Sequence, residues 1–253
     1  MMKISIWING IWITMAIIFD EKKYAEEILA NRNDGRNITQ KQLNTLAKYY
    51  SYLGYDNMKI RELLIQFGKD KEGSFNEVVN EYRLTNALKA TKYPLRVGRK
   101  VMLTKKEVGV LLGIQDINVR KVLFVILVVA KYFMRDNFVA YQGGISDLFK
   151  LAKLSHLPKQ TKQSIIHTLG TLGLIKADLK FGFYHILFFD PEDKSVEITI
   201  DDFSDIMNFF PVVCQNCGKL MLGKPKRRMI CDECYMEKRR EDNLKKVRKF
   251  RTK

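Results

Sequence analysis

Cysteine, acidic side chains and long apolar runs are all scarce in this chain of 253 residues. The four cysteines lie between Cys214 and Cys234, and this clustering excludes a disulfide-stapled secreted scaffold and favours a reducing compartment, the cytoplasm. A composition of 46% hydrophobic and 11% aromatic residues excludes an acidic or low-complexity disordered chain, because it is enough to bury a core. The length suits one large domain or two to three small ones.

No membrane-spanning helix is expected, because the two most apolar runs are short. A span needs about 20 apolar residues. Residues 4–19 are interrupted by polar residues and a glycine, and residues 122–130 are flanked by basic side chains. No A-x-A-like cleavage site follows the first run, which argues against a signal peptide. We expect residues 1–14 to be an upstream extension of the reading frame, with Met15 as the start, and residues 122–130 to form a buried helix.

Basic side chains outnumber acidic ones by 44 to 28, which gives a net charge of +16. Residues 94–140 hold nine of the basic side chains and residues 214–253 hold fourteen. Such blocks attract polyanions, either nucleic acid or an anionic membrane face, because each neutralised phosphate releases counterions. A tail that only improves solubility is the alternative.

The apolar pattern predicts a mainly α-helical protein with a small β component. Residues 15–93 have apolar positions at three- and four-residue spacings, interrupted by turn signals, which is typical of four amphipathic helices in a bundle. The fourth helix is expected to bury Phe75, Val78, Val79 and Tyr82. The expected parts are an upstream extension at 1–14, a helical bundle at 15–93, a basic linker at 94–103, a winged-helix-like domain with an extra hairpin at 104–210, and a four-cysteine zinc finger with a basic C-terminal helix at 211–253.

Two local signals predict where helices begin in the second domain. Thr104 and Glu107 have the spacing of a capping box, so a short helix is expected from there to Gly113. Asp116 can cap a long apolar helix over 117–135, and this helix is expected to be the central buried element.

The segment from Ile145 to Phe189 has the order of a winged helix-turn-helix. A short amphipathic helix at 145–154 precedes a turn at 155–158 and a second helix at 159–172, which is expected to bury Leu172 among other apolar residues. Alternating β-rich sequence then predicts a hairpin, with Gly182 at its tip, and a hairpin partner strand at 196–200. The LGTLGLIKA passage resembles the junction at which a winged-helix recognition helix ends and the first wing strand begins.

The outward face of the second helix has side chains suited to phosphates and base edges. Docking of a protein partner is the alternative role, because the net charge of this domain is near zero. The expected nucleic-acid contacts in this domain are Lys159, Gln160, Lys162, Gln163, His167 and, at the wing, Lys180.

Two C-x-x-C pairs separated by thirteen residues are the strongest motif in the chain. Four thiolates at this spacing can surround one Zn²⁺ and close all its positions, so the site is expected to be structural. A redox-active thiol pair is the competing interpretation. A hairpin is expected over Lys219 to Ile230, around Gly223. The expected zinc ligands are Cys214, Cys217, Cys231 and Cys234.

The second cysteine pair opens into a basic helical run. The order is a C-x-x-C turn, a hairpin and a second C-x-x-C turn at the N-terminus of a helix. This order resembles the treble-clef zinc fingers, including those of ribosomal proteins and of many bacterial and phage DNA-associated proteins. Phosphate contacts are expected from Lys226, Arg227, Arg228, Lys238, Arg239, Arg240, Lys245, Lys246, Arg248 and Lys249.

From Met15 onward the chain resembles uncharacterised proteins of phages and other mobile elements of Gram-positive bacteria that combine a winged-helix-like domain with a C-terminal four-cysteine finger. The segments that carry this resemblance are MAIIFDEKKYAEEIL, LFVILVVAKYF, LGLI, ITIDDF and CQNCGK. The resemblance implies no established activity.

These patterns favour a non-enzymatic DNA-binding protein, with duplex DNA as its partner, that acts in transcription regulation or replication. An RNA-binding protein is the first alternative, because treble-clef modules with basic helices also hold RNA. An adaptor that docks on host or phage polymerase or replication proteins is the second. An enzyme is not expected, because no phosphate loop or nucleophile triad occurs and the three histidines have no partners suited to catalysis.

Overall fold

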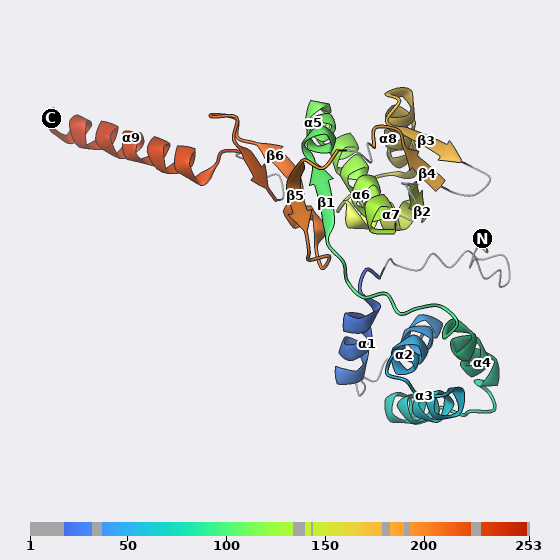
Figure 1. Cartoon of the computed structure of the whole chain (residues 1–253). Coiled ribbons are helices and arrows are strands. Elements are labelled where there is room, and N and C mark those ends of the chain that lie inside the picture. Colours follow the sequence, from blue (N-terminus) through green and yellow to red (C-terminus); the bar gives the residue numbers. More distant parts are fainter. Residues whose placement is uncertain are drawn as a thin grey trace. The chain divides into compact units, whose positions relative to one another are not determined.

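The computed structural model describes residues 18–31, 37–133, 140–142, 144–178, 183–189, 193–223 and 229–251. The expected extension at 1–14, the wing tip at Gly182 and the basic residues at 224–228 lie outside these ranges. The chain divides into two compact units, Met1–Arg99 and Lys100–Lys253. The described part is mainly helical, with small antiparallel sheets in the second unit (Figure 1).

The first unit consists of helices that share one core (Figure 1). Side chains at three- and four-residue spacings meet there, and Leu43, Leu46, Ile60, Leu64 and Leu84 are fully buried. The helices are α1 (Glu21–Ala30), α2 (Gln40–Tyr52), α3 (Asn57–Lys71) and α4 (Glu81–Ala90). The first three begin at polar caps, which accept hydrogen bonds from backbone N–H groups of the first turn: Asp20, Thr39 and Asp56.

The start of the fourth helix was wrongly predicted. Phe75 is buried, but Val78 and Val79 are 79% and 80% exposed and precede α4. The Asn76 carboxamide oxygen accepts hydrogen bonds from the backbone N–H groups of Val78 and Val79, which holds these residues in turns. The helix therefore begins later, and it buries Leu84 and Ala87 instead.

The first half of the expected basic linker is attached to the start of α1. The Arg96 guanidinium and backbone N–H both donate to the Glu21 carboxylate, at 2.6 and 2.9 Å, and Glu21 also pairs with Lys48 at 3.0 Å. The backbone N–H of Gly98 donates to Asp20 at 3.1 Å. A side chain at position 98 would meet that carboxylate, because a Cβ would lie 2.6 Å from the Asp20 Oδ2 atom.

The second unit is built around α6 (Ile117–Phe133), whose residues 122–130 are all fully buried, as predicted. Before it, α5 (Lys105–Gly113) begins with the predicted capping box of Thr104 and Glu107. The Asp116 carboxylate accepts from the backbone N–H groups of Asn118 and Val119, which confirms it as the cap of α6.

A two-stranded antiparallel sheet joins distant segments in this unit. Strand β1 (Val101–Thr104) pairs with β5 (Val196–Ile200), with Val101 opposite Ile200 (Figure 1). The basic linker therefore ends before Val101 rather than at 103, because that residue is buried in a strand. The 196–200 strand also differs from its prediction, since its partner precedes α5 and is not the wing hairpin.

Two helices and a three-stranded sheet follow α6. Helix α7 (Ile145–Leu151) leads through a turn into α8 (Lys159–Thr171), and the chain continues into β3 (Ile175–Asp178) and β4 (Phe183–Ile186). The sheet order is β2–β4–β3, antiparallel throughout. Strand β2 (Ala140–Gln142) was not predicted, and Leu172 is exposed rather than buried because it lies past the end of α8.

The C-terminal part of the second unit begins with the 3-10 helix η1 (Ile206–Phe209) and continues into β6 (Pro211–Val213) and β7 (Leu220–Leu222), an antiparallel pair. The first cysteine pair lies in the loop between these strands. Strand β7 thus pairs with the preceding strand β6, while most of the second arm of the hairpin expected over Lys219–Ile230 lies outside the described residues. Helix α9 (Asp232–Arg251) ends the described chain.

Among the helices described here, none combines the length and the apolar character that crossing a membrane requires.

Candidate metal centre and nucleic-acid interface

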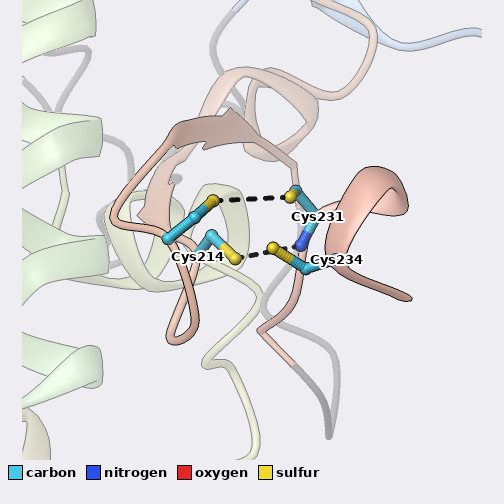
Figure 2. Close-up of side chains that lie close together, drawn as sticks. Cys214, Cys231 and Cys234 are labelled. Atoms are coloured by element: carbon cyan, nitrogen blue, oxygen red, sulfur yellow. Dashed lines mark hydrogen bonds between the residues drawn. The ribbon is translucent and has the colours of Figure 1, made fainter. Parts of the chain in front are cut away.

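The four cysteines meet at one point of the second unit. Their Sγ atoms all lie within 4.8 Å of one another, and the Cys217 and Cys231 sulfurs are 3.6 Å apart. Figure 2 shows the labelled side chains of Cys214, Cys231 and Cys234 close together, with Cys234 on the first turn of α9. The cluster can hold a metal ion, as the C-x-x-C spacing predicts.

Tight turns of the backbone bring the two pairs together. The Gly218 N–H donates to the Cys214 carbonyl at 3.0 Å, and Gly218 has a φ of +73°, which only glycine adopts without strain. The Gln215 N–H donates to the Met229 carbonyl at 2.8 Å and ties the loop of the first pair to the segment before the second. These backbone hydrogen bonds thus hold the loop of the first cysteine pair beside the segment that leads to the second pair.

The thiols differ in their electrostatic surroundings. Backbone N–H groups of Cys231 and Cys217 donate to the Cys214 sulfur and lower the pKa of this thiol to about 6. The Asn216 side chain lowers the pKa of Cys234, but the Cys231 and Cys217 thiols and burial raise it more, to about 12. One thiolate among close thiols is a strong donor site for a cation, since the ligand form of cysteine is the thiolate.

The predicted nucleic-acid contacts on α8 fall into two groups. Lys159, Gln160, Gln163 and His167 are exposed. Lys162 is half-buried, because its ammonium donates to the Ser155 carbonyl at 2.7 Å and lies 5.7 Å from the centre of the Phe149 ring. Lys162 therefore joins α8 to the preceding turn and to α7.

The α8 surface includes further polar residues that the sequence analysis did not single out. Ser164 and Thr171 are exposed and lie three or four positions from Gln160, Gln163 or His167. The helical period places all five on one face, opposite the buried Ile165 and Leu169. The signal was available in the sequence, because these positions continue the polar side of the same pattern.

The remaining predicted contacts lie in the C-terminal part or outside the described ranges. Lys238, Arg239 and Arg240 are exposed on α9. Lys245, Lys246, Arg248 and Lys249 lie on the last turns of the same helix. Outside the described residues are Lys180, Lys226, Arg227 and Arg228.

Comparison of this chain with models of known protein families, with curated proteins and with solved structures gives no match.

Proposed function

We propose that this chain is a non-enzymatic, zinc-containing DNA-binding protein of a phage or mobile element, which acts in transcription regulation or replication. The observation on which this rests most is the exposed face of α8. It presents lysine, glutamine and histidine side chains, and α8 has no acidic residue along its thirteen positions. Such a face suits a polyanion whose base edges offer hydrogen-bond donors and acceptors.

The elements around α8 support a winged helix-turn-helix. Helices α7 and α8 are joined by residues 152–158, and the β3–β4 hairpin follows α8 and pairs with β2. In a helix-turn-helix the second helix enters the major groove, and here that is the helix with the polar, acid-free face. Lys162 supports this interpretation, because its bond to the Ser155 carbonyl fixes the second helix to the turn.

Zinc is the metal that suits the cysteine cluster best. Four sulfurs about 2.3 Å from a tetrahedral Zn²⁺ lie about 3.8 Å apart. The cluster is close to this, with all Sγ atoms within 4.8 Å and the Cys217–Cys231 pair at 3.6 Å. Four thiolate ligands leave no coordination position open, so a zinc ion here would hold β6, β7 and α9 together rather than act on a substrate.

The test is a gel-shift titration of the zinc-loaded, full-length protein with random duplex DNA, single-stranded DNA and a structured RNA hairpin. Duplex DNA is expected to bind most tightly, and its affinity is expected to fall as salt rises, because phosphate contacts release counterions. Lys159→Ala is expected to weaken duplex binding, whereas Lys23→Ala, at an exposed lysine of α1, serves as the matched control.

Tighter binding to the RNA hairpin would replace this proposal with an RNA-binding function. Failure to bind any of the three probes at low salt would favour an adaptor that docks on a host or phage protein.

A further inference from the structure

We infer that Gln160 and Gln163 give the α8 surface a preference for adenine in the major groove of its DNA site. This inference rests on the proposed function and specifies the sequence class that the surface selects. Three observations support it: both side chains are exposed without a hydrogen-bond partner in the described part of the chain, they share one helix face, and the glutamine carboxamide can both donate and accept.

The carboxamides of Gln160 and Gln163 are exposed and form no hydrogen bond with another residue in the described part of the chain. The glutamine side chains on the other described helices form hydrogen bonds within the protein. Gln40 donates to Asn44 and Gln66 donates to Asp70, at 2.8 and 2.6 Å, and Gln42 accepts from the Thr39 N–H at 2.9 Å. The two glutamines of α8 thus keep a donor and an acceptor available for a ligand.

The helical period of α8 places both glutamines on one face. Gln160 and Gln163 are three residues apart, so they are neighbours on one face. Ser164, His167 and Thr171 extend this face over about 16 Å, at 1.5 Å per residue. The opposite face holds Ile165 and Leu169, which are buried and fix the rotation of the helix about its axis.

The carboxamide of glutamine matches adenine, since it can donate to the N7 acceptor and accept from the N6 amino group at the same time. Lysine or arginine would favour guanine instead. Of the two lysines in this half of α8, Lys162 is bound to the Ser155 carbonyl, while Lys159 lies at the first position of the helix, where a phosphate contact is the simpler role. The two exposed glutamines, Gln160 and Gln163, are thus the side chains of this face best suited to contact bases.

The experiment selects binding sites from a randomised duplex library with the full-length, zinc-loaded protein. The wild type is expected to enrich sites with adenines within a few base pairs of one another. Gln160→Met/Gln163→Met keeps side-chain length and helix propensity but removes the hydrogen bonds, and it is expected to lose this enrichment. On the selected duplex, each substitution is expected to weaken binding by about 5- to 150-fold, with little effect on random duplex.

A second probe carries 7-deazaadenine at the enriched positions, which removes only the N7 acceptor. It is expected to bind the wild type more weakly and to leave the affinity of the double variant unchanged. Gln115→Met, at an exposed glutamine of the same unit outside α8, is the matched control and should keep the wild-type preference. Melting temperature and zinc content of each variant verify folding.

Three outcomes would overturn the inference. Duplex binding without any enrichment, or enrichment that persists in the double variant, would refute the role of the glutamines while the proposed DNA-binding function stands. Absence of binding to any duplex would refute both.

Discussion

The carboxylate of Glu107 lies in the interior of the second unit, with only 1% of its side chain exposed. Both of its oxygens accept from the Lys131 ammonium, at 2.9 and 2.8 Å, and one also accepts from the Thr104 N–H. This single side chain caps α5 and attaches it to the last turn of α6. The Lys131 side chain is itself only 12% exposed, so both charges of this ion pair are largely shielded from water.

Glu107→Gln is therefore expected to lower the free energy of unfolding by about 3 to 5 kcal/mol, because it removes the interior carboxylate charge with which Lys131 pairs. Urea denaturation followed by circular dichroism measures the loss. Glu62→Gln is the matched control, since Glu62 also pairs with a lysine, Lys59, but the Glu62 side chain is 65% exposed. It should cost less than about 1 kcal/mol, and equal losses in the two variants would contradict the argument.

Lys159 and Lys162 show how far single residues can be predicted from the sequence. Both are lysines on the polar side of one amphipathic pattern, so the sequence treats them alike. The distinction arises from the turn before α8, which brings the Ser155 carbonyl within 2.7 Å of Lys162. No periodicity encodes where a turn places a carbonyl group. The meeting of the four cysteines, in contrast, could be predicted, because the C-x-x-C spacing is itself a local property of the chain.

At the scale of elements, α9 begins in the cysteine cluster, and its next ten residues do not pack into a core. Every described side chain from Tyr235 to Leu244 is exposed. Helices in proteins gain most of their stability from packing, so this exposed part of α9 gains little from tertiary contacts. Its stability is thus expected to depend on the proposed zinc ion at its first turn.

Removing the proposed zinc ion with a chelator is expected to unfold α9 and the β6–β7 loop while the helices of the first unit remain. Amide hydrogen exchange measures this locally: protection should be lost at Cys234 and in the following turns and kept at Leu46 and Ile60. The helical signal in circular dichroism should fall in parallel and return when zinc is restored. Protection in α9 that survives complete zinc removal would contradict this dependence.

Elements with a strong local signal could be predicted, whereas pairings between distant segments could not. The start of α5 and the buried α6 followed from a capping box and a continuous apolar run. Strand β5 was predicted, but its partner β1 lies more than ninety residues earlier. The five residues of β5 carry no signal that identifies the strand with which they pair. The misplaced start of α4 has a local cause, since Asn76 stabilises turns where apolar spacing alone predicted a helix.

At the scale of the whole molecule, the net charge of +16 is unevenly distributed even within one helix. Residues 232–243 of α9 have five acidic and three basic side chains, whereas residues 244–251 have five basic and no acidic ones. Attraction for a polyanion is therefore expected to come mainly from the end of α9. The basic residues at this end also suit the partial negative charge of a helix C-terminus.

Lys245→Ala/Lys246→Ala/Lys249→Ala is expected to weaken binding to all duplex sequences alike. The plot of log affinity against log salt should become shallower, by up to about 2.7, at about 0.9 for each lost phosphate contact. Fluorescence anisotropy at several salt concentrations measures this slope. Lys238→Ala/Arg239→Ala/Arg240→Ala, which removes the same number of basic side chains from the half with excess acid, should change the slope less, and an equal or larger change in this control would show that the first half of the helix makes the contacts.

The attachment of Arg96 and Gly98 to the start of α1 has a consequence for protein engineering. Glu21 binds the backbone of Arg96, and Asp20 binds that of Gly98, so the chain leaves the first unit beside the point at which its helices begin. Units whose two ends meet tolerate circular permutation and insertion into foreign loops. The first unit is therefore expected to fold when transplanted as a cassette, and also when new ends are opened at the exposed turn around Gly54 and residues 20 and 98 are joined by a short peptide.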